Sequence, residues 1–244
     1  LGKEIWAFIP KNVLPYLKYL KESLYCHIYT VDLTPYIFDT SIGDPASGDV
    51  SASAKTVNHW RTILIGSMRM GGACKNSTAS CTVDLNGDGA IDNKDCVKTP
   101  ISDNGYSSYF ALDITDQNNP TLLWEFSNSE LGFTTTGPAI LRIGSDTTKN
   151  GKWFVVFGSG PTGPISISDQ QFLGNSDQNL RLFVLDLKTG SLLRTIDTGI
   201  QYAFAGSMLN VTHDSDLDYQ DDAVYIPYVK KCTAATTYCT VDTW

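Results

Sequence analysis

The chain has no long apolar run, because none of its apolar stretches approaches the ~20 residues that a membrane-spanning helix needs. Its basic side chains are outnumbered, with 18 Lys and Arg against 26 Asp and Glu and a formal net charge of -8. No Lys/Arg cluster gives an electrostatic footprint for a nucleic acid or an anionic membrane surface. A signal peptide is missing too, but the abrupt start at Leu1 gives that little weight. We expect no membrane-spanning segment and no nucleic-acid partner.

Motifs of common enzyme classes are missing as well. Ser159 lacks the Gly-x-Ser-x-Gly frame of a nucleophile elbow. The glycine-rich stretch 158–163 is followed by no helical pattern, which a phosphate-binding loop requires. The three histidines, His27, His59 and His213, are scattered, and we expect surface or packing roles for them. We therefore expect that the chain is not an enzyme.

What the chain does have is a run of closely spaced carboxylates at residues 214–222. Calcium takes about six to eight oxygen ligands, and alternate side chains of a curled loop can supply them, with one backbone carbonyl near position 7. Four Asp residues at positions 1, 3, 5 and 9 fit this pattern, and the loop leads into a strand. Without a cation, such carboxylates would repel one another. The predicted calcium ligands are Asp214, Asp216, Asp218, Gln220 (through its backbone) and Asp222. The alternative is a solvated acidic turn that needs no metal.

A second acidic segment, at residues 84–95, is closer to the EF-hand formula. It fits positions 1, 3, 5, 9 and 12, with Gly89 at the sharp turn. Asp replaces Glu at position 12, as in dockerin-type loops, so a shorter arm must reach the ion. The predicted ligands are Asp84, Asn86, Asp88, Ala90 (through its backbone), Asp92 and Asp95. Two bound calcium ions would bring the formal charge of -8 to -4.

Six cysteines point to an oxidising compartment. Cys232 and Cys239 bracket a short segment after a strand, which favours a stapled hairpin loop. Some pairing is also expected within the group around the second acidic segment, which consists of Cys74, Cys81 and Cys96. Zinc is the alternative for that group, although no CxxC motif and no nearby His support it. Cys26 stands apart, and the full connectivity stays open.

Two segments of the chain read as copies of one four-stranded unit. The first has candidate strands at 34–38, 60–66, 109–114 and 122–126, and the second at 137–143, 153–158, 182–187 and 192–196. Ala111-Leu112-Asp113 in the first matches Val184-Leu185-Asp186 in the second. A third, partial copy begins at 204–209, passes through the acidic loop and continues at 223–228.

Repeated four-stranded sheets with turn-rich connections are typical of a β-propeller. We therefore expect an all-β chain, with residues 1–244 forming part of a larger propeller of large four-stranded blades. A strand at 4–9 would remain from an earlier blade, a short helix is expected at 11–20, and the calcium-loop insertion at about 73–105. An ordinary β-sandwich is the alternative architecture.

Several stretches, in this order along most of the chain, also match a known family. They are GKEIWAFIP at 2–10, VLP at 13–15, HIYTVD at 27–32 with TP at 34–35, WRTILIG at 60–66 with GG at 71–72, YFALDIT at 109–115, Pro120, WEF at 124–126 and the acidic loop at 214–222. With them the chain resembles the PilY/PilC family of type IV pilus proteins, specifically the C-terminal β-propeller domain.

The resemblance implies a function. In that family the loop equivalent to residues 214–222 is the calcium site. The resemblance therefore implies a calcium-binding, tip-associated adhesin and biogenesis factor of type IV pili, in which calcium occupancy modulates pilus extension, retraction and surface adhesion. The implied partners are minor pilins at the pilus tip and a host or abiotic surface. The implied location is extracellular, at the pilus tip or the outer-membrane surface.

Two other functions stay open. Quinoprotein dehydrogenases are propellers that bind pyrroloquinoline quinone beside calcium, and Ala111-Leu112-Asp113 with Trp124 echoes their repeat. The chain lacks the adjacent cysteine pair of many such alcohol dehydrogenases. The other is a generic calcium-dependent carbohydrate or protein binder, such as an integrin-like propeller, whose metal loops also join strands within a blade.

Overall fold

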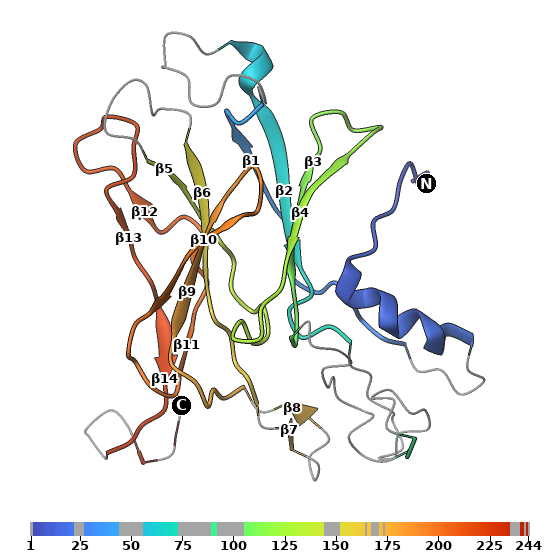
Figure 1. Ribbon diagram of the computed structural model, residues 1–244, viewed down its shortest axis with the longest axis vertical. Coiled ribbons are helices and arrows are strands. Elements are labelled where there is room, and N and C mark those ends of the chain that lie inside the picture. Colours follow the sequence, from blue (N-terminus) through green and yellow to red (C-terminus); the bar gives the residue numbers. More distant parts are fainter. Residues whose placement is uncertain are drawn as a thin grey trace.

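The computed structural model describes residues 2–21, 27–43, 56–72, 89–91, 105–143, 152–163, 165–166, 171–172, 174–234, 240–241 and 243. The described chain is all-β in character, with mostly antiparallel sheets and little helix (Figure 1). Within these residues no helix is long and apolar enough to cross a membrane.

A first four-stranded antiparallel sheet follows the order of the sequence. Its strands are β1 (Tyr36–Thr40), β2 (Arg61–Ser67), β3 (Tyr109–Asp113) and β4 (Thr121–Phe126), with a short 3₁₀ turn, η3 (Val57–His59), before β2. Because side chains alternate along a strand, Ile63 and Ile65 of β2 lie on one face, and both are fully buried.

A second antiparallel sheet repeats the same arrangement. Its strands are β5 (Ala139–Arg142), β6 (Trp153–Gly158), β9 (Arg181–Asp186) and β10 (Leu192–Asp197), in the order β10-β9-β6-β5. A small pair, β7 (Ile165–Ser166) and β8 (Gln171–Phe172), lies between β6 and β9 in the sequence. Asp113 and Asp186 end the third strand of their sheets, so the predicted register of the repeat is confirmed. All eight strands begin and end within two residues of the predicted bounds.

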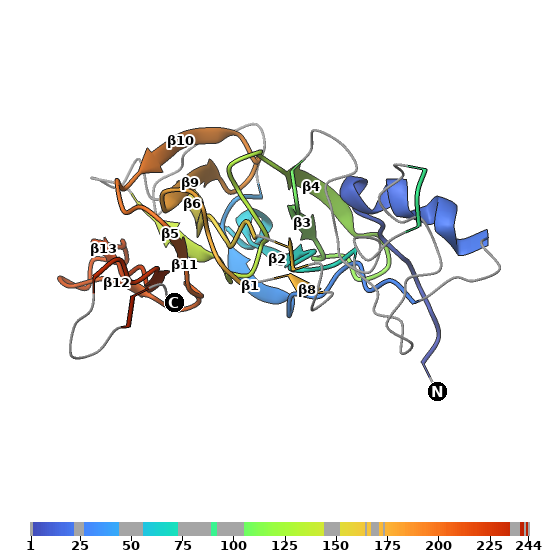
Figure 2. The same ribbon diagram turned by 90° about the horizontal axis from the view of Figure 1, so that it is seen from below.

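One continuous apolar core joins the two sheets. The ring of Tyr109 stacks on Phe157 at 4.2 Å between centroids, and Phe126 contacts both Phe157 at 5.3 Å and Phe183 at 5.6 Å. The hydroxyl of Tyr109 donates to the carbonyl oxygen of Thr136 at 2.6 Å, and burial raises the pKa of this phenol. In Figure 2 the two sheets lie side by side, with β1 and β5 at one side and β4 and β10 at the other.

The third unit is an irregular hairpin. Its arms pair as β11 (Ala203–Ala205) with β14 (Tyr228–Lys230), and as β12 (Thr212–His213) with β13 (Ala223–Val224). Strand β11 contacts β6 and β12 contacts β5, so the first sheet, the second sheet and the hairpin follow one another across the molecule (Figures 1 and 2).

The predicted strands of this third unit are partly wrong. The strand predicted at 204–209 ends at Ala205, and the one predicted at 223–228 is split into β13 and β14. The interruption lies at Pro227, whose carbonyl oxygen accepts from Gly206 N at 2.7 Å. Proline has no N–H to return to the ladder, so pairing stops there.

The strand predicted at 4–9 is also wrong. This segment instead lies against the first sheet: the rings of Phe8 and Phe110 are 5.0 Å apart, and Trp6 Nε1 donates to Gln117 O at 3.1 Å. Residues 5–9 form a continuous apolar run, but no strand among the described residues pairs with this segment, so its backbone joins no ladder.

The helix predicted at 11–20 is confirmed as η1 (Lys11–Lys21), in 3₁₀ form. Pro15 lies inside it and lacks the N–H that a regular α-helix would use. Val13 and Tyr16 are buried, whereas Leu14, Leu17 and Leu20 are exposed.

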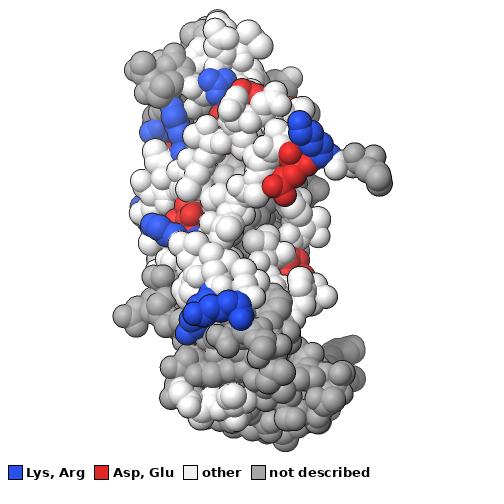
Figure 3. Space-filling model, turned by 90° about the vertical axis from the view of Figure 1, so that its right-hand side faces the viewer, with Lys and Arg blue, Asp and Glu red and all other residues white. Residues whose placement is uncertain are grey.

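On the face of the molecule seen in Figure 3, charged side chains are few and scattered among the described atoms.

Candidate metal centre

The acidic loop at residues 214–222 forms the tip of the third unit. It connects β12 to β13, whose two residue pairs are Thr212 with Val224 and His213 with Ala223. The N–H of Asp222 donates to the carbonyl oxygen of His213 at 2.9 Å, which closes the base of the loop. The loop therefore precedes the segment 223–228 as predicted, but β12 lies between it and the strand predicted at 204–209.

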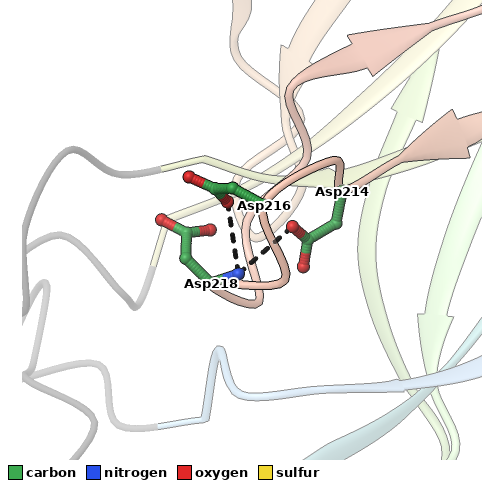
Figure 4. A group of neighbouring side chains, drawn as sticks. All are labelled: Asp214, Asp216 and Asp218. Atoms are coloured by element: carbon green, nitrogen blue, oxygen red, sulfur yellow. Dashed lines mark hydrogen bonds between the residues drawn. The ribbon is translucent and has the colours of Figure 1, made fainter.

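Three predicted ligands converge in this loop. Asp214, Asp216 and Asp218 offer carboxylate oxygens that lie within 4.8 Å of one another (Figure 4). The N–H of Asp218 donates to Oδ1 of Asp214 at 3.2 Å and to Oδ1 of Asp216 at 3.3 Å, and Tyr219 N donates to Asp214 Oδ2 at 2.8 Å. The loop thus curls around its own carboxylates.

The loop can curl in this way because two of its residues have a left-handed backbone conformation. Leu217 and Tyr219, which stand between the aspartates, have φ of 63° and 68°. The left-handed region is uncommon for bulky residues, so the loop holds both in a strained conformation. Their side chains are 79% and 75% exposed, while the alternate Asp side chains converge.

The other two predicted ligands have other partners. Asp222 Oδ2 accepts from the hydroxyl of Ser215 at 2.5 Å and from its N–H at 2.8 Å, and these bonds lower the pKa of Asp222. Gln220 Nε2 donates to Asp218 Oδ2 at 3.2 Å. Asp222 does not belong to the converging group, so its role as a ligand and that of the Gln220 backbone stay predictions.

The donors present fit a hard cation. Calcium binds oxygen, and three carboxylates converge here. The buried side-chain oxygen of Gln220 has no hydrogen-bond partner among the described residues, which leaves one more acceptor beside Asp218. The carboxylates also accept N–H bonds from the loop itself, so the turn has internal support apart from any ion.

Arg142, which no sequence pattern singled out, anchors the loop to β5. Its N–H donates to Asp221 Oδ2 at 2.7 Å, and Asp221 N donates to the Arg142 carbonyl at 2.8 Å. The guanidinium carbon lies 5.6 Å from the ring centroid of Trp153 and 5.7 Å from that of Tyr219. The sequence feature that could have pointed to this contact is Asp221, an acidic residue of the loop that is not at a predicted ligand position.

Little of the second acidic segment can be compared with the structure. Gly89 has φ of 89°, as expected for the sharp turn, and Ala90 is exposed. The other predicted ligands, Asp84, Asn86, Asp88, Asp92 and Asp95, lie outside the described residues. The second calcium ion therefore stays a prediction.

The cysteine pairings stay predictions for the same reason. Cys232 is buried and is not a free thiol. Its expected partner, Cys239, lies outside the described residues, as do Cys26, Cys74, Cys81 and Cys96.

Two hollows lie away from the loop. An apolar groove of about 230 Å³ lies between η1 and residues 28–31, next to Phe8. A polar hollow of about 290 Å³ lies where Asp32, Arg69, Thr135 and Ser207 meet, and Arg69 Nη1 is 3.3 Å from Asp32 Oδ2. Across the part of the chain that the structure describes, no second group of three His, Cys, Asp or Glu side chains is placed to hold a metal.

Known proteins resemble the chain in sequence and in fold, although no family model matches it. Type IV pilus biogenesis factor PilY1 of Pseudomonas aeruginosa is 28% identical over 202 residues, which are 80% of this chain and 12% of that protein. A PilY1 homolog of Xylella fastidiosa is 28% identical over 195 residues, 78% of this chain and 10% of that protein. The chain thus spans about a tenth of the length of these curated relatives.

A comparison of the fold with solved structures finds the same group of proteins. The crystal structure of the Pseudomonas aeruginosa PilY1 C-terminal domain matches with a TM-score of 0.52 and 24% identity, over 93% of this chain and 33% of that one. The resemblance predicted from the sequence is confirmed: the chain is similar to type IV pilus biogenesis factors named PilY1, and its fold corresponds to part of the PilY1 C-terminal domain.

Proposed function

We propose that this chain is a calcium-binding β-propeller segment of a type IV pilus protein, with a binding role and not a catalytic one. The observation that carries the proposal is the convergence of Asp214, Asp216 and Asp218 at a hairpin tip, in a chain related to PilY1 proteins. The relatives' name supports a role in pilus biogenesis, and the loop chemistry supports the calcium.

The arrangement of the three units supports a propeller. Two four-stranded sheets run from first to last strand in sequence order, and the third unit packs on the second sheet through β11 and β12. An ordinary sandwich would need two layers only, whereas a propeller stacks one unit on the next around its axis.

The loop would hold calcium through Asp214, Asp216 and Asp218, with Asp222 and Gln220 as further oxygen donors. A bound divalent ion would supply positive charge that offsets the repulsion among the carboxylates. Binding to the folded chain alone would stabilise it by RT ln(1 + [Ca]/Kd), about 2.7 kcal/mol when calcium is a hundredfold above Kd. The residues between the aspartates, Leu217 and Tyr219, face solvent, so occupancy would change the rigidity of an exposed apolar surface.

That surface is the one we propose a partner reads. Minor pilins at the pilus tip and a host or abiotic surface are the proposed partners, and the proposed location is extracellular, at the pilus tip or the outer-membrane surface. Calcium occupancy would then shift the balance between pilus extension and retraction, and with it adhesion.

The test places Asp216→Asn in the full-length gene of the bacterium that carries it, with Asp116→Asn, an exposed acid outside the loop, as the control. We expect Asp216→Asn to change surface piliation, adhesion and calcium-dependent capture of minor pilins, and Asp116→Asn to leave all three unchanged. The proposed role would be refuted if piliation, adhesion and pilin capture were unchanged both by Asp216→Asn and by calcium chelation.

A further inference from the structure

Arg142 lies at the end of β5 and contacts the acidic loop in two ways, through its backbone and through its guanidinium group. We propose that Arg142 is a positioning residue, which fastens the loop to the second sheet so that the three carboxylates are converged before a cation binds. This inference rests on the proposed function, because it concerns the same loop.

The backbone contact fixes the returning arm of the loop. Strand β5 is the edge strand of the second sheet, so its outer N–H and C=O groups are open to another segment. Arg142 uses one of each: its N–H donates to Asp221 Oδ2 at 2.7 Å, and its carbonyl accepts from Asp221 N at 2.8 Å. Asp221 stands between Gln220 and Asp222, so this pair of bonds sets where the arm runs.

The side-chain contact of Arg142 holds the curled part of the acidic loop in place. The Arg142 guanidinium lies over the rings of Trp153 and Tyr219, at 5.6 and 5.7 Å from their centroids. Trp153 belongs to β6, and its indole N–H donates to Ser41 Oγ at 3.0 Å, so this side of the contact is held by both sheets. A cation over an aromatic face is attracted by the ring quadrupole.

Tyr219 connects this contact to the carboxylates. Its ring lies under the guanidinium, while its N–H donates to Asp214 Oδ2 at 2.8 Å. Its φ of 68° is strained, so it needs an external contact to hold it. If the ring leaves Arg142, the N–H that orients Asp214 moves with it. The apparent Kd for calcium then rises, since only the fraction of loops in the converged form binds.

Tyr219→Asn in the complete chain tests the inference. Asn tolerates left-handed backbone but has no ring, so the change removes the contact with Arg142 without adding strain. Leu217→Asn is the matched control, because Leu217 has φ of 63° and is 79% exposed, and its side chain has no aromatic ring for the Arg142 guanidinium to lie over. Tyr219→Phe keeps the ring and should behave as the parent.

Two readouts are measured: the calcium Kd by titration calorimetry, and hydrogen exchange of the Asp218, Tyr219 and Gln220 N–H groups without calcium. For Tyr219→Asn we expect faster exchange and a Kd raised about two- to fivefold, as the loss of an exposed cation–π contact implies. Leu217→Asn should change neither. Exchange and Kd that are equal in Tyr219→Asn, Leu217→Asn and the parent would overturn the inference, even if Asp216→Asn abolishes binding and the proposed site stands. If the parent bound no calcium, the proposed function would be refuted. The hydrogen-exchange comparison of the variants alone would then decide whether Arg142 positions the loop.

Discussion

The indole N–H of Trp124 donates to the carbonyl oxygen of Leu187 at 2.8 Å, which links β4 of the first sheet to the turn after β9 of the second. Gly190 lies in the same turn with φ of 69°, and a Cβ placed on it would come within 2.4 Å of Trp124. The two repeated units therefore interlock at Trp124, beyond the apolar core they share.

This contact can be isolated by comparing Gly190→Ala with Gly199→Ala. Both glycines are left-handed, with φ of 69° and 71°, but a Cβ on Gly199 meets nothing within 4 Å. Gly199→Ala should lower the free energy of unfolding by about 1–2 kcal/mol through backbone strain alone. Gly190→Ala should cost about 1–3 kcal/mol more, because its Cβ overpacks against Trp124. Urea unfolding measures both, and equal losses would contradict the interlock.

Trp124→Phe should leave the carbonyl of Leu187 without its partner in a buried place. We expect a loss of about 1–3 kcal/mol in the free energy of unfolding, on top of the smaller ring. Trp60, which is 43% exposed, provides the control: Trp60→Phe should change stability by less than about 0.5 kcal/mol. Thermal and urea unfolding of the two variants would show no difference if the bond were unimportant.

Asp221→Ala should remove the acceptor of the Arg142 N–H and loosen the loop. Asp221 is half-buried, so we expect a loss of about 1 kcal/mol in the free energy of unfolding. Asp221→Asn keeps a side-chain oxygen in place and should retain most of that stability. If Asn is as damaging as Ala, the carboxylate acts through its charge and not through this hydrogen bond.

The stability of the chain should depend on pH through Asp197. The Gly199 N–H, the Asn179 side chain and the Arg181 charge hold the pKa of this carboxyl below its ordinary value of 3.8. Because the folded pKa is the lower one, the stabilisation is present above about pH 4 and is lost as the pH falls through the folded pKa. Asn179→Ala should raise this pKa toward 3.8, as a carbon-detected NMR titration of the carboxyl would measure. A titration midpoint unchanged by Asn179→Ala would contradict the hydrogen bond.

Much of the sheet structure could be predicted from the sequence. The repeat of Ala111-Leu112-Asp113 as Val184-Leu185-Asp186 gave the register, because equivalent strands of repeated units bury equivalent positions. The segment at 4–9 could not be placed this way, since a short apolar run fits a strand but a strand also needs a neighbour to pair with. The break at Pro227 could not be predicted from the apolar pattern either, because that pattern continues across the proline.

The candidate site was predicted only as far as local spacing reaches. Carboxylates two residues apart in a curled loop converge, and Asp214, Asp216 and Asp218 do. Asp222 turns instead to Ser215, a choice between two nearby partners that spacing does not decide. The anchor between Asp221 and Arg142 joins residues 79 positions apart, so it depends on how the third unit packs on the second sheet.

The most direct test of the central claim is the number of calcium ions that the chain takes up, by titration calorimetry of calcium into the parent, Asp216→Asn and Asp116→Asn. The account predicts that Asp216→Asn loses one equivalent of calcium relative to the parent and that Asp116→Asn loses none. The same calcium stoichiometry and affinity in Asp216→Asn and the parent would contradict it.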